Sequence, residues 1–223
     1  MINKYLIAFI IVLSFISCNN DDPSKNQKGV VYGTFTDTRD GHVYKTVKIG
    51  TQTWMAENLA YMYQSDDKES NLDPCFYVYD YSGTDLTTAK STSAYEKYGV
   101  LYNYLAAQRA VPDGWHLPTI SEWNAIAYTL GGLAVAGGKM KTTQGWKLPN
   151  LNASNSSGFS ALPGGIAFFP SFQQMEIQAA WWSSSASTAP EFMKGKFLLN
   201  DSEELMDCSN SIKRGMSVRC VKD

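Results

Sequence analysis

The sequence predicts an α+β fold in which two helices accompany many short antiparallel strands and long loops. One observation is a helix signal after Leu117-Pro118. Thr119 and Glu122 have the spacing of a capping box, and apolar residues then recur at helical spacing as far as Gly131. The other observation is a series of short segments in which apolar and polar residues alternate, separated by turns rich in Gly, Asn, Asp and Ser. The 223 residues contain no internal repeat and suit one domain preceded by a leader and a tether.

Residues 1–17 are predicted to be a lipoprotein signal peptide. Lys4 is the only charge, and residues 5–16 form a largely apolar run that is too short to span a bilayer comfortably. Small Ser17 precedes Cys18, the expected lipidation site, whereas an ordinary secretory signal with a chance cysteine is the alternative. Residues 18–28 then supply the lipidated cysteine and a polar, flexible tether. The folded domain is predicted to span residues 29–223.

The first half of this domain is predicted to be mainly β-structure. Strands are expected at 30–35, 42–49 and 52–59, and Asp40-Gly41 is a strong hairpin signal between the first two. The tyrosine-rich segment 75–81 is expected to form a further strand. The stretches 66–73 and 82–93, which flank that strand, have the polar composition of loops.

The second half is predicted to contain both helices. One is expected to begin near Tyr102 and the other at Thr119, and the Gly/Ala-rich stretch 131–138 is expected to be a flexible loop. Later strands are expected at 179–185, 192–199 and 216–221, with 201–215 joining the last two. Because aromatic side chains bury the largest area per residue, five residues are the expected structural core. They are Trp54, Trp115, His116, Trp123 and Trp182.

Composition and motifs argue against several kinds of chemistry. The formal charge is −2 and the basic residues are scattered, so nucleic acid is not an expected partner. Only His42 and His116 could act as bases at neutral pH. We expect His116 to be a hydrogen-bonded structural residue and His42 to be exposed. No Gly-x-Ser-x-Gly motif is present. The chain is therefore predicted not to be an enzyme and to need no cofactor.

Export would permit disulfides. With Cys18 lipidated, three cysteines remain, and Cys208 and Cys220 flank a turn-rich stretch across which they could pair. A bond between Cys75 and Cys220 is nearly as consistent with the sequence.

Two further groups are candidate ligand sites. Tyr77, Tyr79 and Tyr81 lie beside long loops and could form an exposed binding surface, although tyrosines in such a segment more often cover the edge of a core. A late acidic loop supplies the oxygen ligands that calcium prefers, although most acidic loops are simply solvated. Its candidate ligands are Asp201, Glu203, Glu204 and Asp207.

A set of motifs occurs in an order that resembles one protein family, the Fibrobacter succinogenes major paralogous domain of exported proteins and lipoproteins in Fibrobacteres and Bacteroidetes. The resemblance covers about residues 33–223. The motifs are Asp40-Gly41, the segments 44–50 and 52–59, Tyr98-Gly99, Gly114-Trp115-His116-Leu117-Pro118, Glu122-Trp123, the segment 158–164, Trp182-Ser183-Ser184 and the segment 217–223.

This family is distantly similar to the C-type-lectin-like and formylglycine-generating-enzyme folds, which implies a C-type-lectin-like arrangement here. Many members carry a cysteine where this chain has Val111, so their disulfide cannot be carried over to Cys220. The resemblance implies no activity and no catalytic residues. Acidic residues after Cys18 also resemble the surface-export signal of Bacteroidetes lipoproteins, which implies a surface-exposed lipoprotein of the outer membrane.

Together these observations predict a surface-anchored lipoprotein that acts as a non-catalytic binding or adhesion module. The expected partners are the membrane, through the lipid anchor only, and an extracellular glycan or protein. The alternative is a structural cell-surface protein with no small ligand. An enzyme related to the formylglycine-generating type is the third hypothesis.

Overall fold

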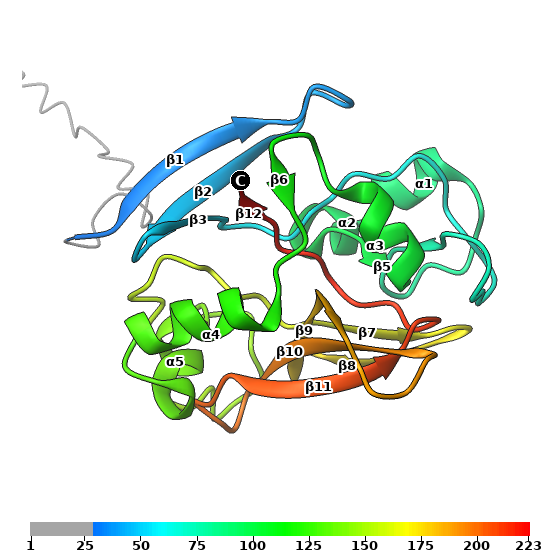
Figure 1. Cartoon of the computed structure of the whole chain (residues 1–223). Helices are drawn as coiled ribbons and strands as arrows, with labels where there is room; N and C mark the ends of the chain where they lie inside the picture. The colour runs from blue at the N-terminus through cyan, green and yellow to red at the C-terminus, as the bar shows by residue number, and fades with distance from the viewer. Residues whose placement is uncertain (1–28) are drawn as a thin grey trace, which may run out of the picture.

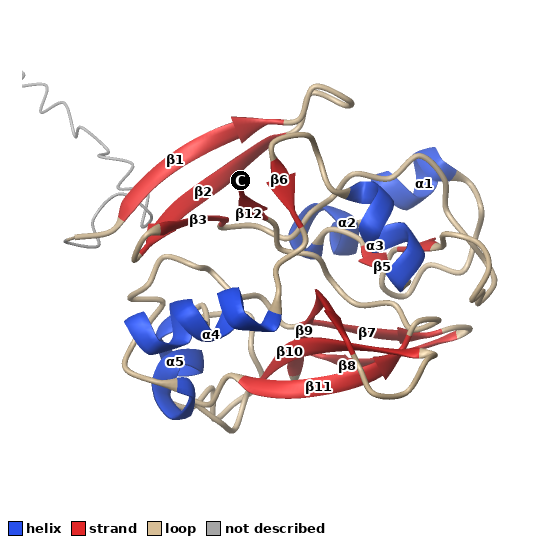
Figure 2. Cartoon of the chain, viewed as in Figure 1, coloured by secondary structure: helices blue, strands red, loops and turns tan. Residues whose placement is uncertain are grey.

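The structure is a computed structural model that describes residues 29–223. The predicted signal peptide, Cys18 and the tether lie outside the described residues. Two five-stranded sheets form the framework, and the helices lie beside them in two groups (Figures 1 and 2). No helix within residues 29–223 is long and apolar enough to cross a membrane.

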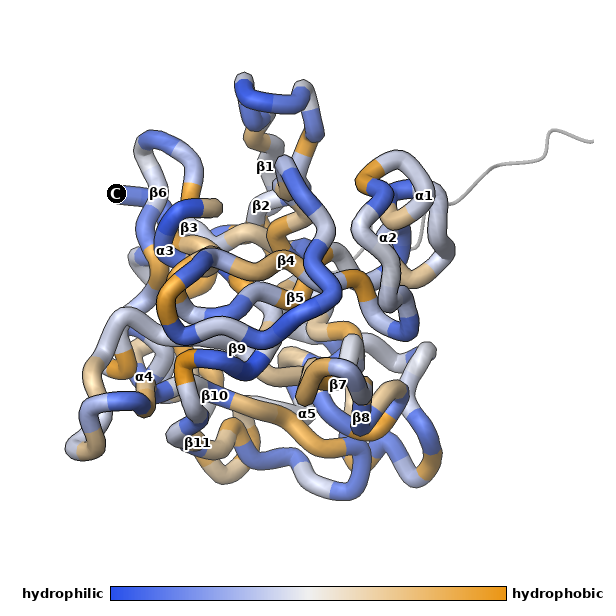
Figure 3. The backbone as a smooth tube through the Cα atoms, turned by 90° about the vertical axis from the view of Figure 1, so that its right-hand side faces the viewer, coloured by the Kyte–Doolittle hydropathy of each residue, from blue (hydrophilic) through white to orange (hydrophobic). Residues whose placement is uncertain are grey.

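The first sheet contains the N-terminal meander and the C-terminus. Its strands run in the order β1 (Val31–Thr36), β2 (Val43–Ile49), β3 (Gln52–Met55), β12 (Val221–Lys222) and β6 (Trp115–His116), and all neighbours are antiparallel. The predicted meander is therefore confirmed. The polar turn between β1 and β2 forms a hydrophilic tip at the edge of the molecule (Figure 3). Tyr44 is buried between the exposed residues Val43 and Lys45, as the period of two in a half-buried strand requires.

The second sheet is built from the late part of the chain. Its strands run in the order β11 (Met206–Ser211), β10 (Phe192–Leu199), β9 (Gln178–Ala186), β7 (Gly164–Phe168) and β8 (Ser171–Met175). The β7–β9 pair is parallel and the others are antiparallel. The strands predicted at 179–185 and 192–199 are confirmed. The interpretation of 201–215 as a simple connection is wrong, because β11 pairs with β10 at the edge of the sheet, where a polar sequence can still form a strand.

Five helices lie within the described residues, so the expectation of two was wrong. They are α1 (Leu86–Lys90), α2 (Ser93–Tyr98), α3 (Tyr104–Ala110), α4 (Ile120–Thr129) and α5 (Leu133–Met140). A small two-stranded sheet, β4 (Phe76–Tyr77) with β5 (Leu101–Tyr102), accompanies the first three. The two predicted helices correspond to α3 and α4. In α4 the capping box is present, since Glu122 N–H donates to Thr119 Oγ1 at 3.1 Å and Thr119 N–H donates to Glu122 Oε2 at 2.8 Å.

The missed helices depend on local caps and tertiary packing. Asp85 and Thr92 cap α1 and α2, which are too short to show an apolar period. Helix α5 occupies the stretch expected to be a flexible loop. A Cβ atom on Gly137 would stand only 2.8 Å from the backbone oxygens of Glu203 and Glu204. The glycine therefore allows the helix to approach this backbone closely, and packing outweighs low helix propensity.

The buried side chains form two large clusters on opposite faces of β9. Trp181 belongs to one cluster and Trp182 to the other, and both are fully buried. Trp54 and Trp123 are also fully buried, with ring centroids 4.7 Å apart, and Trp115 is only 7% exposed. These four predicted core tryptophans are confirmed. His116 is not a core residue, because 38% of its side chain is exposed.

The segment from Gly215 to Val221 is buried along its whole length and passes between the two sheets. Met216 exchanges two backbone hydrogen bonds with Tyr102, and Ser217 O accepts one from the Trp182 N–H. Further along, Val218 O and Cys220 O accept from the N–H groups of Leu59 and Met55. The end of the chain thus joins β5, β9 and the segment that follows β3.

Arg219 lies at the centre of this segment, fully buried. Its guanidinium donates to Asn58 Oδ1 at 2.7 Å and to the backbone oxygens of Met55 (3.3 Å), Phe159 (2.5 Å) and Ser160 (3.0 Å). It also stands 4.5 Å from the centroid of the Phe159 ring. Burial lowers the pKa of Arg219 to about 9, so the group still carries its charge at neutral pH.

Replacing Arg219 with Met should lower the free energy of unfolding by roughly 2–4 kcal/mol, because several buried acceptors lose their donor at once. Urea denaturation at pH 7 measures this change. Arg109→Met is the matched control, since Arg109 is exposed and makes no hydrogen bond to the described residues; its effect should stay within about 0.5 kcal/mol. Equal stability of the wild type and Arg219→Met would show that the desolvation of the charge cancels its hydrogen bonds.

Candidate functional site

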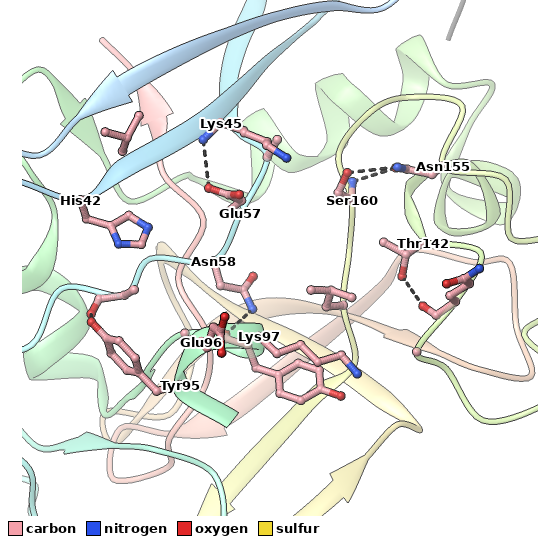
Figure 4. Close-up of a pocket in the computed structure, with 18 of the residues that line it drawn as sticks. His42, Lys45, Glu57, Asn58, Tyr95, Glu96, Lys97, Thr142, Asn155 and Ser160 are labelled. Atoms are coloured by element: carbon pink, nitrogen blue, oxygen red, sulfur yellow. Dashed lines mark hydrogen bonds between the residues drawn. The ribbon is translucent and has the colours of Figure 1, made fainter. Parts of the chain in front are cut away.

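A cleft of about 1010 Å³ lies between the first sheet, α2 and the loop 142–162. Figure 4 shows its lining, with His42, Lys45 and Glu57 on one side and Thr142, Asn155 and Ser160 on the other. Its aliphatic lining is limited to Val43, two alanines and Leu162. Most of the lining residues therefore carry a charged, hydroxyl, amide or phenol group, although carbon atoms make up more of the exposed lining than polar atoms do.

The first wall comes from the outward face of β2 and the segment after β3. Because β2 alternates, burial of Tyr44 directs Val43 and Lys45 toward the cleft. Glu57 is held beside them, since its Oε2 accepts the backbone N–H of Lys45 at 2.9 Å (Figure 4). His42 is exposed at the end of this wall, as the sequence predicted.

The second wall is α2, which contributes four consecutive residues, Tyr95, Glu96, Lys97 and Tyr98. Tyr95 is oriented by its hydroxyl, which donates to Ala60 O at 3.0 Å. The Lys97 ammonium stands 4.9 Å from the centroid of the Tyr98 ring, within the range of a cation–π contact. Glu96 and Lys97 are exposed, so their charges face the solvent-filled cleft.

The third wall is a loop that is ordered by its own side chains. Asn155 Nδ2 donates to Ser160 Oγ at 3.0 Å, and the Ser160 N–H donates back to Asn155 Oδ1 at 2.8 Å (Figure 4). Both residues adopt positive φ angles, 49° and 56°. Thr142 Oγ1 donates to Gln144 O at 2.8 Å, whereas the Gln144 side chain is exposed and makes no hydrogen bond to the described residues. This wall is therefore preorganised, and the Gln144 amide and the exposed Thr143 hydroxyl at its rim make no hydrogen bond to the described residues.

Asn58 forms the floor of the cleft and is fully engaged. Its Nδ2 donates to Tyr98 O at 2.9 Å and lies 3.3 Å from Ser217 Oγ. Its Oδ1 accepts from Trp181 Nε1 at 3.0 Å and from Arg219 Nε at 2.7 Å. The amide thus joins the cleft to both sheets through the C-terminal segment.

The structure does not assemble the predicted tyrosine surface. Tyr77 is 1% exposed, and its hydroxyl donates to Lys68 O at 2.8 Å. Tyr79 packs against Phe172, and the Tyr81 hydroxyl donates to Asp85 O. Strand β4 ends at Tyr77, so the alternation expected through Tyr81 is absent. The Tyr77 ring lies in the core.

The structure does not bring the predicted calcium ligands together: within residues 29–223 no group of three or more His, Cys, Asp or Glu side chains is placed to hold an ion. The Lys141 ammonium occupies the inner side of this loop and donates to the carbonyls of Leu199 (3.1 Å) and Ser202 (2.8 Å). Burial lowers the pKa of Lys141 to about 8. The predicted ligands have other surroundings: Glu203 accepts from Asn152, Asp207 pairs with Lys196 at 2.7 Å, and Asp201 and Glu204 are exposed.

The predicted disulfide is not formed, because Cys75, Cys208 and Cys220 are all free cysteines. Cys208 lies on β11 of the second sheet, whereas Cys220 precedes β12 of the first. They are therefore not partners across one late hairpin, as the sequence suggested. Burial raises the pKa of the Cys208 thiol to about 11 and that of Cys220 further.

Sequence reasoning missed the cleft. Its lining comes from separate segments between Tyr32 and Leu162, and no short motif marks any of them as functional. The one local signal is the cluster of tyrosines and charges at 95–98.

His116 lies outside the cleft and bridges two carboxylates. Its Nε2 stands 2.7 Å from Glu122 Oε1 and its Nδ1 stands 2.7 Å from Asp223 Oδ1. Both ring nitrogens face acceptors, which favours the imidazolium form. Burial alone would lower the pKa of His116, but the hydrogen bonds to the two carboxylates outweigh it, so the pKa is raised above its ordinary value of 6.5. Burial opposes the shift at Glu122 as well, yet bonds to Thr119 and His116 lower the pKa of that carboxyl.

This bridge should stabilise the fold most in mildly acidic solution. A raised histidine pKa contributes stability that is complete below pH 6.5 and is lost as the pH rises through the folded value. The lowered pKa of Glu122 contributes above its ordinary value of 4.5 and is lost as the pH falls. Urea denaturation should therefore show His116→Gln less stable than the wild type by about 0.5–1 kcal/mol near pH 5.5, allowing for solvent screening, with a smaller difference at pH 8.5. His42→Gln is the control, and a difference independent of pH for His116→Gln would contradict the bridge.

One known protein family matches most of the folded domain. The profile of the Fibrobacter succinogenes major domain matches residues 47–222, from β2 to β12. No curated protein and no solved structure matches the chain. The match includes the β2–β3 hairpin, α4 and the C-terminal segment that carries Arg219. The chain therefore belongs to the Fibrobacter succinogenes major domain family.

Proposed function

We propose that this domain is the non-catalytic binding module of a surface-anchored lipoprotein, and that its cleft binds a glycan. The cleft between the first sheet, α2 and the loop 142–162 carries this proposal, because of its size and because most of its lining residues carry polar groups beside apolar surface. The anchor rests on the apolar run at residues 5–16 followed by Cys18, and on the polar residues after it. An outer-membrane, cell-surface location is part of the same proposal.

The composition of the cleft favours a sugar over an apolar small molecule. Pockets for apolar ligands are lined mainly by hydrophobic side chains. A sugar ring instead offers hydroxyls that donate and accept, together with an apolar C–H face. The cleft supplies matching groups: the Gln144 amide and Thr143 hydroxyl at the rim, and the phenol rings of Tyr32, Tyr95 and Tyr98.

The proposal also includes a C-type-lectin-like arrangement for the fold. Its support is the mixed α+β architecture with long loops and the helix that starts at Thr119 after Leu117-Pro118, which resembles the helix start of that group. The carbohydrate site proposed here does not depend on the acidic loop and needs no metal ion. Binding in the presence of a chelator is therefore expected.

A tryptophan that fills the cleft should weaken glycan binding without unfolding the domain. Val43 is 55% exposed on β2 and lines the cleft, and tryptophan is well tolerated on an exposed strand. The full-length chain in detergent is first screened on a glycan array, with and without EDTA. For a glycan that binds, calorimetry should show that Val43→Trp weakens binding by at least about tenfold, or 1.4 kcal/mol.

Val31→Trp is the matched control. Val31 is an equally exposed valine (62%) on β1 of the same sheet, it does not line the cleft, and its substitution should leave binding unchanged. Equal loss in both variants would place the site elsewhere. A folded wild type that binds no glycan would contradict the proposal and favour a protein partner or a structural role.

A further inference from the structure

The net charge of the residues that line the cleft has the opposite sign to that of the whole chain. The full sequence has a formal charge of −2, yet three lysines and two glutamates line the cleft, with His42 beside them. The lysines are Lys45, Lys90 and Lys97, and the glutamates are Glu57 and Glu96. Among residues 29–223 none of these five is part of an ion pair. The lining thus holds an excess positive charge that protein carboxylates leave unneutralised.

The two glutamates differ in burial and in hydrogen bonding, and therefore in how far they can neutralise the charges of the lysines. Glu57 is half-buried, and one of its oxygens accepts the backbone N–H of Lys45. Glu96 lies between Tyr95 and Lys97 on α2 and is exposed to solvent like Lys97, so solvent screens both charges. Lys90, from the end of α1, and Lys97, from α2, line the same cleft and make no hydrogen bond to the described residues. Their ammonium groups are therefore available to a ligand.

A further positive charge lies beneath the floor. Arg219 donates only to neutral acceptors, and no carboxylate of the described residues is within ion-pair distance of it. Two of these acceptors, Asn58 and Ser160, belong to lining residues of the cleft. A buried charge is screened less than an exposed one, and a cleft with low-dielectric walls concentrates the field of such charges. Glu57, in the cleft lining, acts on Arg219 at longer range and offsets part of this charge. Arg219 and the three lysines still outnumber the two glutamates, so the charge at the cleft is positive.

From this charge distribution we infer that the cleft prefers an acidic glycan, one that carries carboxylate or sulfate groups, over a neutral one. This inference rests on the proposed function, because it names the class of sugar that the same site binds. Lys90 and Lys97 contact the anionic group directly, since an ammonium presents three donors that follow an oxyanion in any orientation. Arg219 acts at longer range through the floor, and the tyrosine rings contact the sugar ring.

The test compares pairs of polymers that differ only in charge. The full-length chain in detergent is titrated with polygalacturonate and its methyl ester, and with dextran sulfate and dextran; the two pairs distinguish carboxylate from sulfate recognition. At 0.1 M salt at least one acidic polymer should bind at least about tenfold more tightly than its neutral partner. The preference should shrink at 1 M salt, where the Debye length falls from about 10 Å to about 3 Å.

The double variant Lys90→Gln, Lys97→Gln should lose most of this preference while it retains the thermal stability of the wild type. The matched control is Lys194→Gln, Lys222→Gln, two exposed lysines outside the cleft, which should retain the preference. Equal losses in the two double variants would mean non-specific attraction and would overturn the inference. Equal binding of charged and neutral polymers would overturn the inference and leave the proposed function intact, whereas a folded protein that binds no polymer or glycan would overturn both.

Discussion

The guanidinium of Arg219 and the amide of Asn58 meet at 2.7 Å in the middle of the molecule, and the other parts of the structure converge on this hydrogen bond. The guanidinium also binds the carbonyl of Met55 at the end of β3 and the carbonyls of Phe159 and Ser160 in the third cleft wall. A buried charge is costly unless every donor finds an acceptor. This requirement holds three distant segments in one relative position, which a purely apolar contact would specify less sharply.

The same bond explains why the cleft has a rigid floor. Asn58 faces the cleft on one side and binds Arg219 and Trp181 on the other, so the floor moves only if both sheets move. The walls differ from the floor, because the β2 side chains and α2 are partly solvated and the loop 142–162 is held by its own Asn155–Ser160 pair. A preorganised cleft floor with accessible polar groups at the rim suits ligand recognition, since little conformational entropy is lost when a ligand binds.

Features that depend on contacts between near neighbours in the chain were predicted from the sequence, and features that depend on contacts between distant residues were not. The start of helix α4 was predicted to its N-cap, Thr119, because a capping box is a contact between Thr119 and Glu122. The meander was predicted because alternation in β2 reflects one buried face. Helix α5 was missed because Gly137 is explained only by the backbone of Glu203 and Glu204, far along the chain. The surroundings of the acidic loop were missed for the same reason, since Lys141, far from it in the chain, occupies its inner side.

The sequence by itself determined the family, the α+β class, the four buried tryptophans and the capped helix, because each depends on residue type and local spacing. Only the tertiary structure decided where the proposed binding cleft lies. The cleft walls come from segments more than a hundred residues apart, and the charge beneath its floor comes from Arg219 near the other end of the domain. Such a site is defined by long-range packing, and its residues have no fixed spacing in the chain. No local pattern could therefore reveal it.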